Sequence, residues 1–248
     1  MNRTIFSFFI TFLAGISTVL GIIPCFISYK YKDYIISFSL AFASGVMLTI
    51  SFLSLLSESF YLINSLFFYF PSILITFIFV VIGIIFSSVI DSYIEKKINN
   101  NLLKLGIISV IALVIHNIPE GITTFISTSY NLKLGISLSL AIALHNIPEG
   151  ISIAIPIYYS TGSIKKSFFY TVAAGFSELL GALIAYLFVF KYINNLLLGI
   201  ILAITAGIMI HISIYELIPN SLSYKKNKTF FIGIILGILI MFLCKYYF

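Results

Sequence analysis

Eight long blocks of apolar residues follow one another along this 248-residue chain, and only 9% of its residues are charged. Each block holds about 20 residues, the length that an α-helix needs to cross a hydrocarbon core of about 30 Å. A transmembrane β-barrel would instead show alternating segments of about ten residues. The connections are too short for a soluble domain. We therefore predict an all-α, polytopic membrane protein with a single transmembrane domain and spans at about 5–27, 34–57, 70–92, 102–127, 135–157, 167–190, 193–218 and 229–247.

The placement of cations predicts how the chain is oriented. Ten of the fourteen lysines and arginines lie in the loops after spans one, three, five and seven. Cytoplasmic loops carry such an excess, so we expect these loops in the cytoplasm and both termini outside an inner (plasma) membrane. The net charge of +6 thus indicates orientation and not a nucleic-acid partner. Arg3 before the first block is compatible with a signal peptide, but no small-residue cleavage site follows Pro24, so we interpret the block as a span.

The interior of several spans holds ionisable groups that a bilayer tolerates poorly. An ionised side chain at mid-bilayer costs at least about 2.5–3.5 kcal/mol, and such residues usually serve a function. All lysines and arginines sit in loops or at span ends, so these groups must hold protons or meet a cation from outside the chain. Imidazole and carboxylate together suit a first-row divalent metal such as zinc or iron. The residues concerned are Glu120, Glu149, Glu178, His116, His145 and His211.

The stretch HNIPEG occurs twice, at residues 116–121 and 145–150. In each copy the histidine and the glutamate are four residues apart and share a helix face, with the asparagine on its flank. The proline lacks an N–H and displaces the carbonyl four residues back, so we predict a kink and a free carbonyl at Ile115 and at Leu144. Unpaired backbone at this depth is tolerated where it lines a polar cavity. Each copy therefore offers several ligand-type groups to one polar interior.

The two copies lie in neighbouring spans that must run antiparallel, joined by a short loop around residues 129–133. Counted from that loop, their depths differ by only about 5 Å at 1.5 Å per residue. Glu178 in span six is flanked by Gly175, Ser177 and Gly181, and such small residues let helices approach closely. With this third carboxylate there is room for two metal ions that share bridging glutamates. The candidate metal ligands are His116, Asn117, Glu120, His145, Asn146, Glu149 and Glu178.

A weaker repeat relates residues 44–56 of span two to residues 206–218 of span seven, at an offset of 162. Because the copies are an odd number of spans apart, they run in opposite directions. This predicts a 3+2+3 arrangement, with spans one to three and six to eight as inverted repeats around a central pair, which is a recurring transporter design. Met47, His211 and Glu216 are candidates for the ion pathway. We expect Glu216 and Glu58 near the outer boundary, where they would attract cations, although packing or solvation of a helix end also explains such residues.

The paired HNIPEG motifs, the eight spans and the glutamate in span six resemble the ZIP (Zrt-, Irt-like) family of divalent-metal transporters, in its bacterial zinc-uptake branch. The resemblance covers essentially the whole chain and implies a binuclear metal centre at mid-membrane. It implies a first site at His116, Glu120 and Glu149, with a contribution from span two at or near Met47. The second site that it implies comprises Asn117, Glu120, Asn146, Glu149 and Glu178, with His145 beside them.

The chain departs from the family pattern in two places. Span two ends in SLLSES, where relatives carry an acidic, proline-containing end, while residues 216–219 keep the matching ELIP. The histidine-rich cytoplasmic loop of many eukaryotic members is absent, because residues 94–105 form a short segment without histidine. Regulation through such a loop is therefore not expected.

These observations predict a carrier that moves divalent metal into the cytoplasm, with zinc first and iron, manganese, cobalt and cadmium as alternatives. The expected partners are the metal ion, the lipid bilayer and, because of the small-residue faces, a second copy in a homodimer. No cofactor besides the transported metal is expected. An intramembrane metal-dependent hydrolase is the main alternative, since a catalytic zinc needs three protein ligands and an open position. A proton channel or exchanger and a metal exporter are further alternatives.

Overall fold

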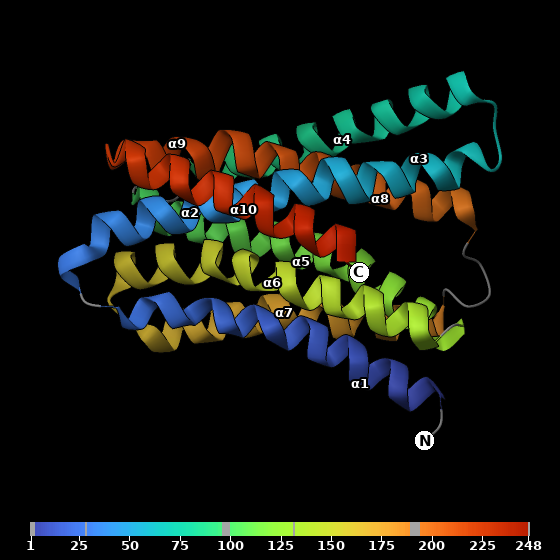
Figure 1. Ribbon diagram of the computed structural model, residues 1–248, viewed down its shortest axis with the longest axis horizontal. Helices are drawn as coiled ribbons and strands as arrows, with labels where there is room; N and C mark the ends of the chain where they lie inside the picture. Colours follow the sequence, from blue (N-terminus) through green and yellow to red (C-terminus); the bar gives the residue numbers. More distant parts are fainter. Residues whose placement is uncertain (1–2, 28, 96–99, 131, 189–193, 248) are drawn as a thin grey trace.

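The computed structural model describes residues 3–27, 29–95, 100–130, 132–188 and 194–247, and helices account for nearly all of them (Figure 1). Within these residues, eight helical segments are long and apolar enough to span a membrane, as the sequence predicts. The elements in chain order are α1 (Arg3–Ile16), η1 (Ser17–Phe26), η2 (Tyr29–Tyr31), α2 (Lys32–Ile50), η3 (Ser51–Leu55), α3 (Leu56–Asn64), α4 (Tyr69–Glu95), α5 (Asn101–Tyr130), α6 (Leu132–Thr161), α7 (Ile164–Leu187), α8 (Asn195–His211), η5 (Ile212–Leu217), α9 (Ile218–Ser223) and α10 (Asn227–Tyr247).

Three of the spans combine elements of different helical type. The first continues from α1 into the 3₁₀ segment η1. The second and the seventh pass through π-helical turns, η3 and η5, and reach Asn64 and Ser223, beyond the ends expected from hydropathy. Mid-helix π turns often mark functional sites. These two turns fall within the two segments that the sequence relates at an offset of 162.

The helices sort into two groups according to what they pack against (Figure 1). The first group consists of α1, η1, α5, α6 and α7, which contact one another extensively. The second group consists of α2, η3, α3, α4, α8, η5, α9 and α10, in which α10 packs along α2 and α4 packs along α8. Contacts between the groups are fewer and run mainly between α2 and α6. The two HNIPEG motifs and Glu178 all belong to the first group.

Glycines bring the backbones of helices into direct contact within each group. In the first group, a Cβ on Gly121 would lie 2.8 Å from the Cα of Glu178 in α7. In the second, a Cβ on Gly83 of α4 would lie 3.1 Å from the Cα of Ile204 in α8. Small residues permit such close approach in membrane helices, where packing and not the hydrophobic effect holds the helices together. Each group is therefore closely packed in itself.

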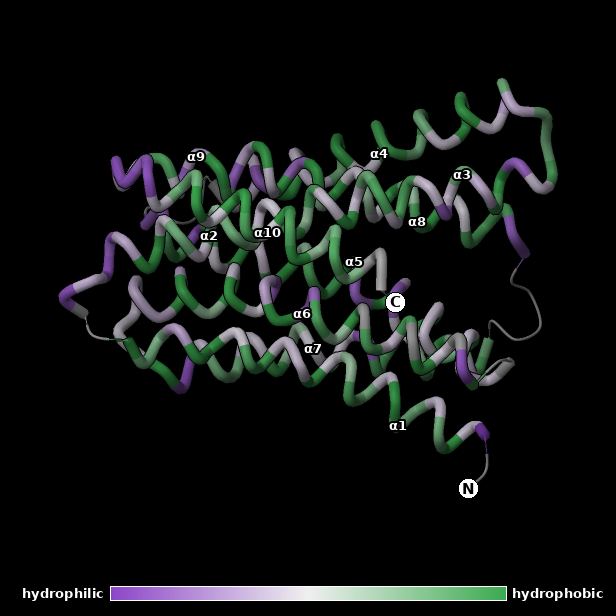
Figure 2. The backbone as a smooth tube through the Cα atoms, viewed as in Figure 1, coloured by the Kyte–Doolittle hydropathy of each residue, from purple (hydrophilic) through white to green (hydrophobic). Residues whose placement is uncertain are grey.

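The distribution of polarity is that of a membrane protein. Large apolar side chains cover the outside, above all on α4 and α10, and hydrophilic residues gather at the ends of the bundle (Figure 2). The interior, by contrast, holds buried glutamates, histidines and asparagines. Lipid tails are as apolar as an exposed leucine, so this surface suits a bilayer, and the buried polar groups need an explanation of their own.

Candidate metal centre

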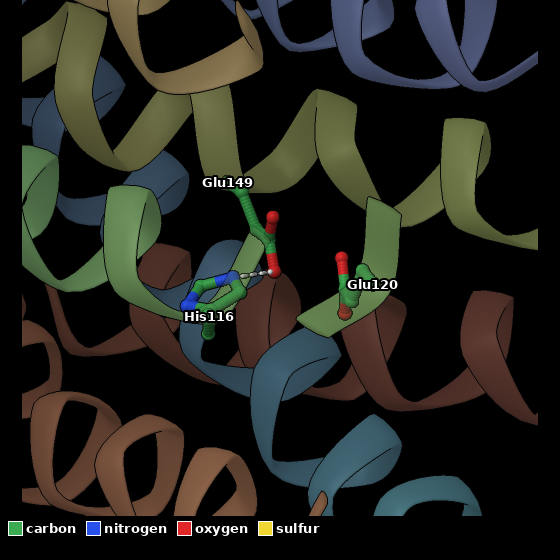
Figure 3. Close-up of side chains that lie close together, drawn as sticks. All are labelled: His116, Glu120 and Glu149. Carbon is green, nitrogen blue, oxygen red and sulfur yellow. Dashed lines mark hydrogen bonds and ion pairs between the residues drawn. The ribbon is translucent and has the colours of Figure 1, made fainter. Parts of the chain in front are cut away.

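His116, Glu120 and Glu149 form a compact buried trio between α5 and α6 (Figure 3). One potential ligand atom from each residue lies within 4.8 Å of the other two. His116 Nε2 forms a hydrogen bond of 3.0 Å with Glu149 Oε1, while Glu120 faces this pair from the same helix as His116. Imidazole nitrogen and carboxylate oxygen are zinc ligands at about 2.0–2.2 Å. A cation placed between these atoms could thus replace the direct hydrogen bond.

A second histidine–glutamate pair crosses between the same two helices. His145 Nε2 of α6 lies 3.3 Å from Glu120 Oε2 of α5. Each histidine is therefore paired with the glutamate of the other motif in the described ion pairs. The spacing of four residues correctly puts the groups on one face. The sequence did not reveal which glutamate each histidine would meet.

The two asparagines of the motifs are anchored by their amide nitrogens. Asn117 Nδ2 donates to the carbonyl of Ala174 in α7 at 3.1 Å, and Asn146 Nδ2 donates to the carbonyl of Ala14 in α1 at 2.9 Å. Asn146 Nδ2 also donates to Glu178 Oε1. These bonds leave both amide oxygens buried without a hydrogen-bond partner among the described residues, so both oxygens could act as ligands.

The cluster contains more unsatisfied acceptors than a protein interior normally tolerates. No lysine or arginine in the described part of the chain pairs with Glu120, Glu149 or Glu178. A buried polar atom left without a partner costs about 1–3 kcal/mol, and more if it is charged. Cations bound in the cluster would give its unpartnered carboxylate and amide oxygens a partner. The unpartnered atoms of the cluster are His116 Nδ1, Asn117 Oδ1, Asn146 Oδ1, Glu149 Oε2 and Glu178 Oε2.

The three pathway candidates come from α2, α8 and η5, which belong to the second group of helices. Met47 is fully buried in the hydrophobic core together with Met209. His211, at the end of α8, stacks on Tyr215 with ring centroids 5.0 Å apart. Glu216 follows in η5, and its Oε1 lies 4.0 Å from Lys104 Nζ at the start of α5.

The expectation that Glu216 shares the outer boundary with Glu58 is wrong. Glu58 lies in α3 and Glu216 in η5 near α9, and Figure 1 shows α3 and α9 at opposite ends of the bundle. Glu216 lies at the end where α4 leads into α5. The reason is chain direction: span two and span seven run in opposite directions, so the late part of each reaches a different side. Under the positive-inside orientation, Glu216 is at the cytoplasmic side.

One repeat was missed at the sequence level. Residues 14–21 read AGISTVLG and residues 174–181 read AGFSELLG. The two segments make equivalent contacts: Ala14 and Ala174 accept the two asparagine bonds, and Gly150 and Gly121 pack on the backbone of Thr18 and Glu178 respectively. Thr18, whose buried hydroxyl has no hydrogen-bond partner in the part of the chain that the structure describes, thus lies where the other half carries Glu178. Self-comparison of spans one and six would have found this repeat.

Fold and site together define a polytopic membrane protein with a buried cluster suited to a divalent cation. Comparison with known proteins agrees with this class: the family model of the ZIP zinc transporters matches residues 95–245. The chain is 36% identical over 260 residues to the zinc transporter ZupT of Oceanobacillus iheyensis, with 97% of each chain covered. It is 36% identical to ZupT of Streptococcus mutans over 256 residues, again with 97% of each covered, and 32% identical to ZupT of Clostridium perfringens over 271 residues, with 97% and 95% covered. The chain therefore belongs to the ZIP zinc transporter family, a family of transporters and not of enzymes.

Proposed function

We propose that this protein carries divalent transition-metal ions across the plasma membrane into the cytoplasm, with zinc as the main substrate. The observation that carries the proposal is the buried trio of His116, Glu120 and Glu149. It lies within a cluster whose glutamates pair with no lysine or arginine of the described chain and that leaves several oxygens unpartnered. Membership of the ZIP family and the ZupT relatives support transport of a metal ion. The metal is the cargo of such a protein and not a resident cofactor.

The proposed first ion is held by His116, Glu120 and Glu149, a nitrogen and oxygen ligand set that suits zinc and its first-row neighbours. The proposed second ion takes Asn117, Asn146 and Glu178 and shares the two glutamates of the motifs, with His145 beside them. The unpartnered amide and carboxylate oxygens on the far side of the cluster favour this second position. Neutral amides bind a divalent ion more weakly than carboxylates, which helps its release. Whether Met47 adds a ligand stays a prediction.

As the mechanism, we propose that the first group of helices moves against the second while it holds the ion. All the proposed ligands except Met47 belong to the first group, which is internally close-packed, so they would move together. The repeat of residues 14–21 and 174–181 and the two π-helical turns support inverted repeats in a 3+2+3 arrangement. Such repeats with a mid-membrane site suit alternating access. An arriving ion sheds its water and replaces the two crossed histidine–glutamate bonds.

The orientation and the oligomeric state belong to the same proposal. The lysine bias supports termini on the outside and entry of the ion from there. The homodimer expected from small-residue faces stays a prediction, since glycines such as Gly15 and Gly45 pack against helices of their own chain. Cross-linking in native membranes tests it.

Zinc uptake into liposomes tests the transport function. The unmodified protein should accumulate zinc, and Glu120→Ala should abolish uptake because it removes a carboxylate that takes part in both proposed sites. Asp33→Ala is the matched control, since it removes an exposed carboxylate in the first turn of α2, which belongs to the second group of helices. Uptake that survives Glu120→Ala, or hydrolysis of lipid or peptide that depends on Glu120, would contradict the proposal. A proton channel would instead retain its flux when His116 and His145 are replaced by glutamine.

A further inference from the structure

Lys104, in the first turn of α5, lies beside two carboxylates that come from other helices. Its Nζ is 3.4 Å from Asp91 Oδ1 and 4.0 Å from Glu216 Oε1. The side chains of the three residues are only 7–19% exposed. Together with His211 and Tyr215 they line a cavity of about 600 Å³ at the end of the bundle opposite Glu58. A lysine and two acids are thus held near one another, with most of each side chain buried.

This cluster connects the two groups of helices. Lys104 is in α5, which belongs to the first group, whereas Asp91 in α4 and Glu216 in η5 belong to the second. The interhelical hydrogen bonds of the metal centre stay within the first group, and the bond from Ser59 Oγ to the carbonyl of Gly199 stays within the second. The backbone contacts of Gly121 and Gly83 also stay within one group each. Each group is therefore tied together internally, and Lys104 ties one group to the other.

The ion pairs of Lys104 lie at a place where α5 makes few other contacts with α4 and η5. Contacts between α4 and α5 and between α5 and η5 are few compared with those inside each group. Elsewhere the groups meet mainly through apolar side chains, and Lys32 Nζ of α2 lies over the Tyr159 ring of α6 at 5.5 Å. Charges attract more strongly here than in water, because water screens a largely buried pair only in part. Removal of one partner from such a pair leaves an uncompensated charge, which is strongly unfavourable. A movement that slides the start of α5 past α4 and η5 would separate Lys104 from its partners.

We propose that Lys104 is an ion-pair latch that holds the first group of helices against the second in the conformation described here. The latch rests on the proposed function, because it regulates the group movement that transport requires. Its two described ion-pair partners, Asp91 and Glu216, are not proposed metal ligands, and Lys104 acts by setting the population of one conformation. Its loss should therefore change the conformational equilibrium and leave the affinity of the metal centre for zinc unchanged.

Distance measurement between spin labels tests the latch directly. Labels at Lys166 in α7 and Lys228 in α10, both exposed, report on the two groups in a chain whose cysteines are replaced by alanine. Lys104→Met should populate a second label distance and shift the ratio of the two conformations at least about fivefold, the factor expected for the loss of roughly 1 kcal/mol. Lys104→Arg keeps the positive charge beside both acids and should keep the original distribution.

Two controls make the result decisive. Lys133→Met removes the same charge from an exposed site on α6 and should leave the distances unchanged. Asp91→Asn weakens the latch without touching Lys104 and should resemble Lys104→Met, which guards against a folding defect of one variant. Label distances in both variants that match the unmodified chain would overturn the latch. Absence of zinc uptake by the unmodified protein would instead count against the proposed function, and the distances are measured without zinc.

Discussion

Replacement of Gly121 by alanine tests whether close packing of α5 on α7 builds the metal centre. The new Cβ would lie 2.7 Å from the carbonyl carbon of Glu178 and 2.8 Å from its Cα. Carbon atoms pack at about 3.5–4.0 Å, so the two helices must separate by roughly 1 Å. Overpacking of this kind costs about 1–3 kcal/mol of stability. Because Glu178 moves with the backbone that is pushed away, its carboxylate should lose its place beside Asn146.

The expected result is a zinc affinity about 10- to 100-fold weaker than that of the unmodified protein, the size of effect seen when groups that orient metal ligands are disturbed. Isothermal titration of the purified protein with zinc measures it, and thermal unfolding measures the loss of stability. Gly83→Ala is the matched control: its Cβ would lie 3.0 Å from the carbonyl carbon of Ile204, in the second group of helices. It should also lower stability but keep the affinity. A folded Gly121→Ala protein with unchanged zinc affinity would refute the reasoning.

Three further predictions follow from the same contacts. His116→Gln should weaken zinc binding more than His145→Gln, because only His116 belongs to the compact trio; equal losses in the titration would contradict this ranking. Ser59→Ala removes a buried bond of 2.7 Å to the carbonyl of Gly199 and should lower the free energy of unfolding by about 1 kcal/mol, with uptake intact in liposomes. Zinc at a hundred times its Kd should stabilise the protein by about 2.7 kcal/mol, seen as a melting temperature that rises with zinc and falls again with a chelator. A melting temperature indifferent to both would argue against a site in the folded protein.

The spans could be predicted from the sequence because an apolar block of about 20 residues has the length of a helix that crosses the hydrocarbon core of a bilayer. The convergence of the HNIPEG motifs could be predicted too, since antiparallel neighbours joined by a short loop place them at similar depth. The crossed pairs of His116 with Glu149 and His145 with Glu120 could not be, because helix spacing gives the face of a residue but not its partner on the next helix.

The other features that the sequence did not predict depend on residues that are far apart in the chain. Asp91 and Lys104 belong to different helices at the two sides of a loop, and Glu216 is more than a hundred residues further along the chain. No periodicity within one helix connects them. The placement of Glu216 at the outer boundary failed for a simpler reason, since the direction of span seven already puts its late residues on the other side.

The central claim is that both HNIPEG motifs hold one transported ion between α5 and α6. Anomalous X-ray scattering at the zinc edge, from crystals grown with zinc, tests it most directly. The account predicts a peak within about 2.0–2.2 Å of ligand atoms of His116, Glu120 and Glu149, and its loss in Glu120→Ala. A zinc-saturated protein that transports zinc but shows no peak between these three residues would contradict it.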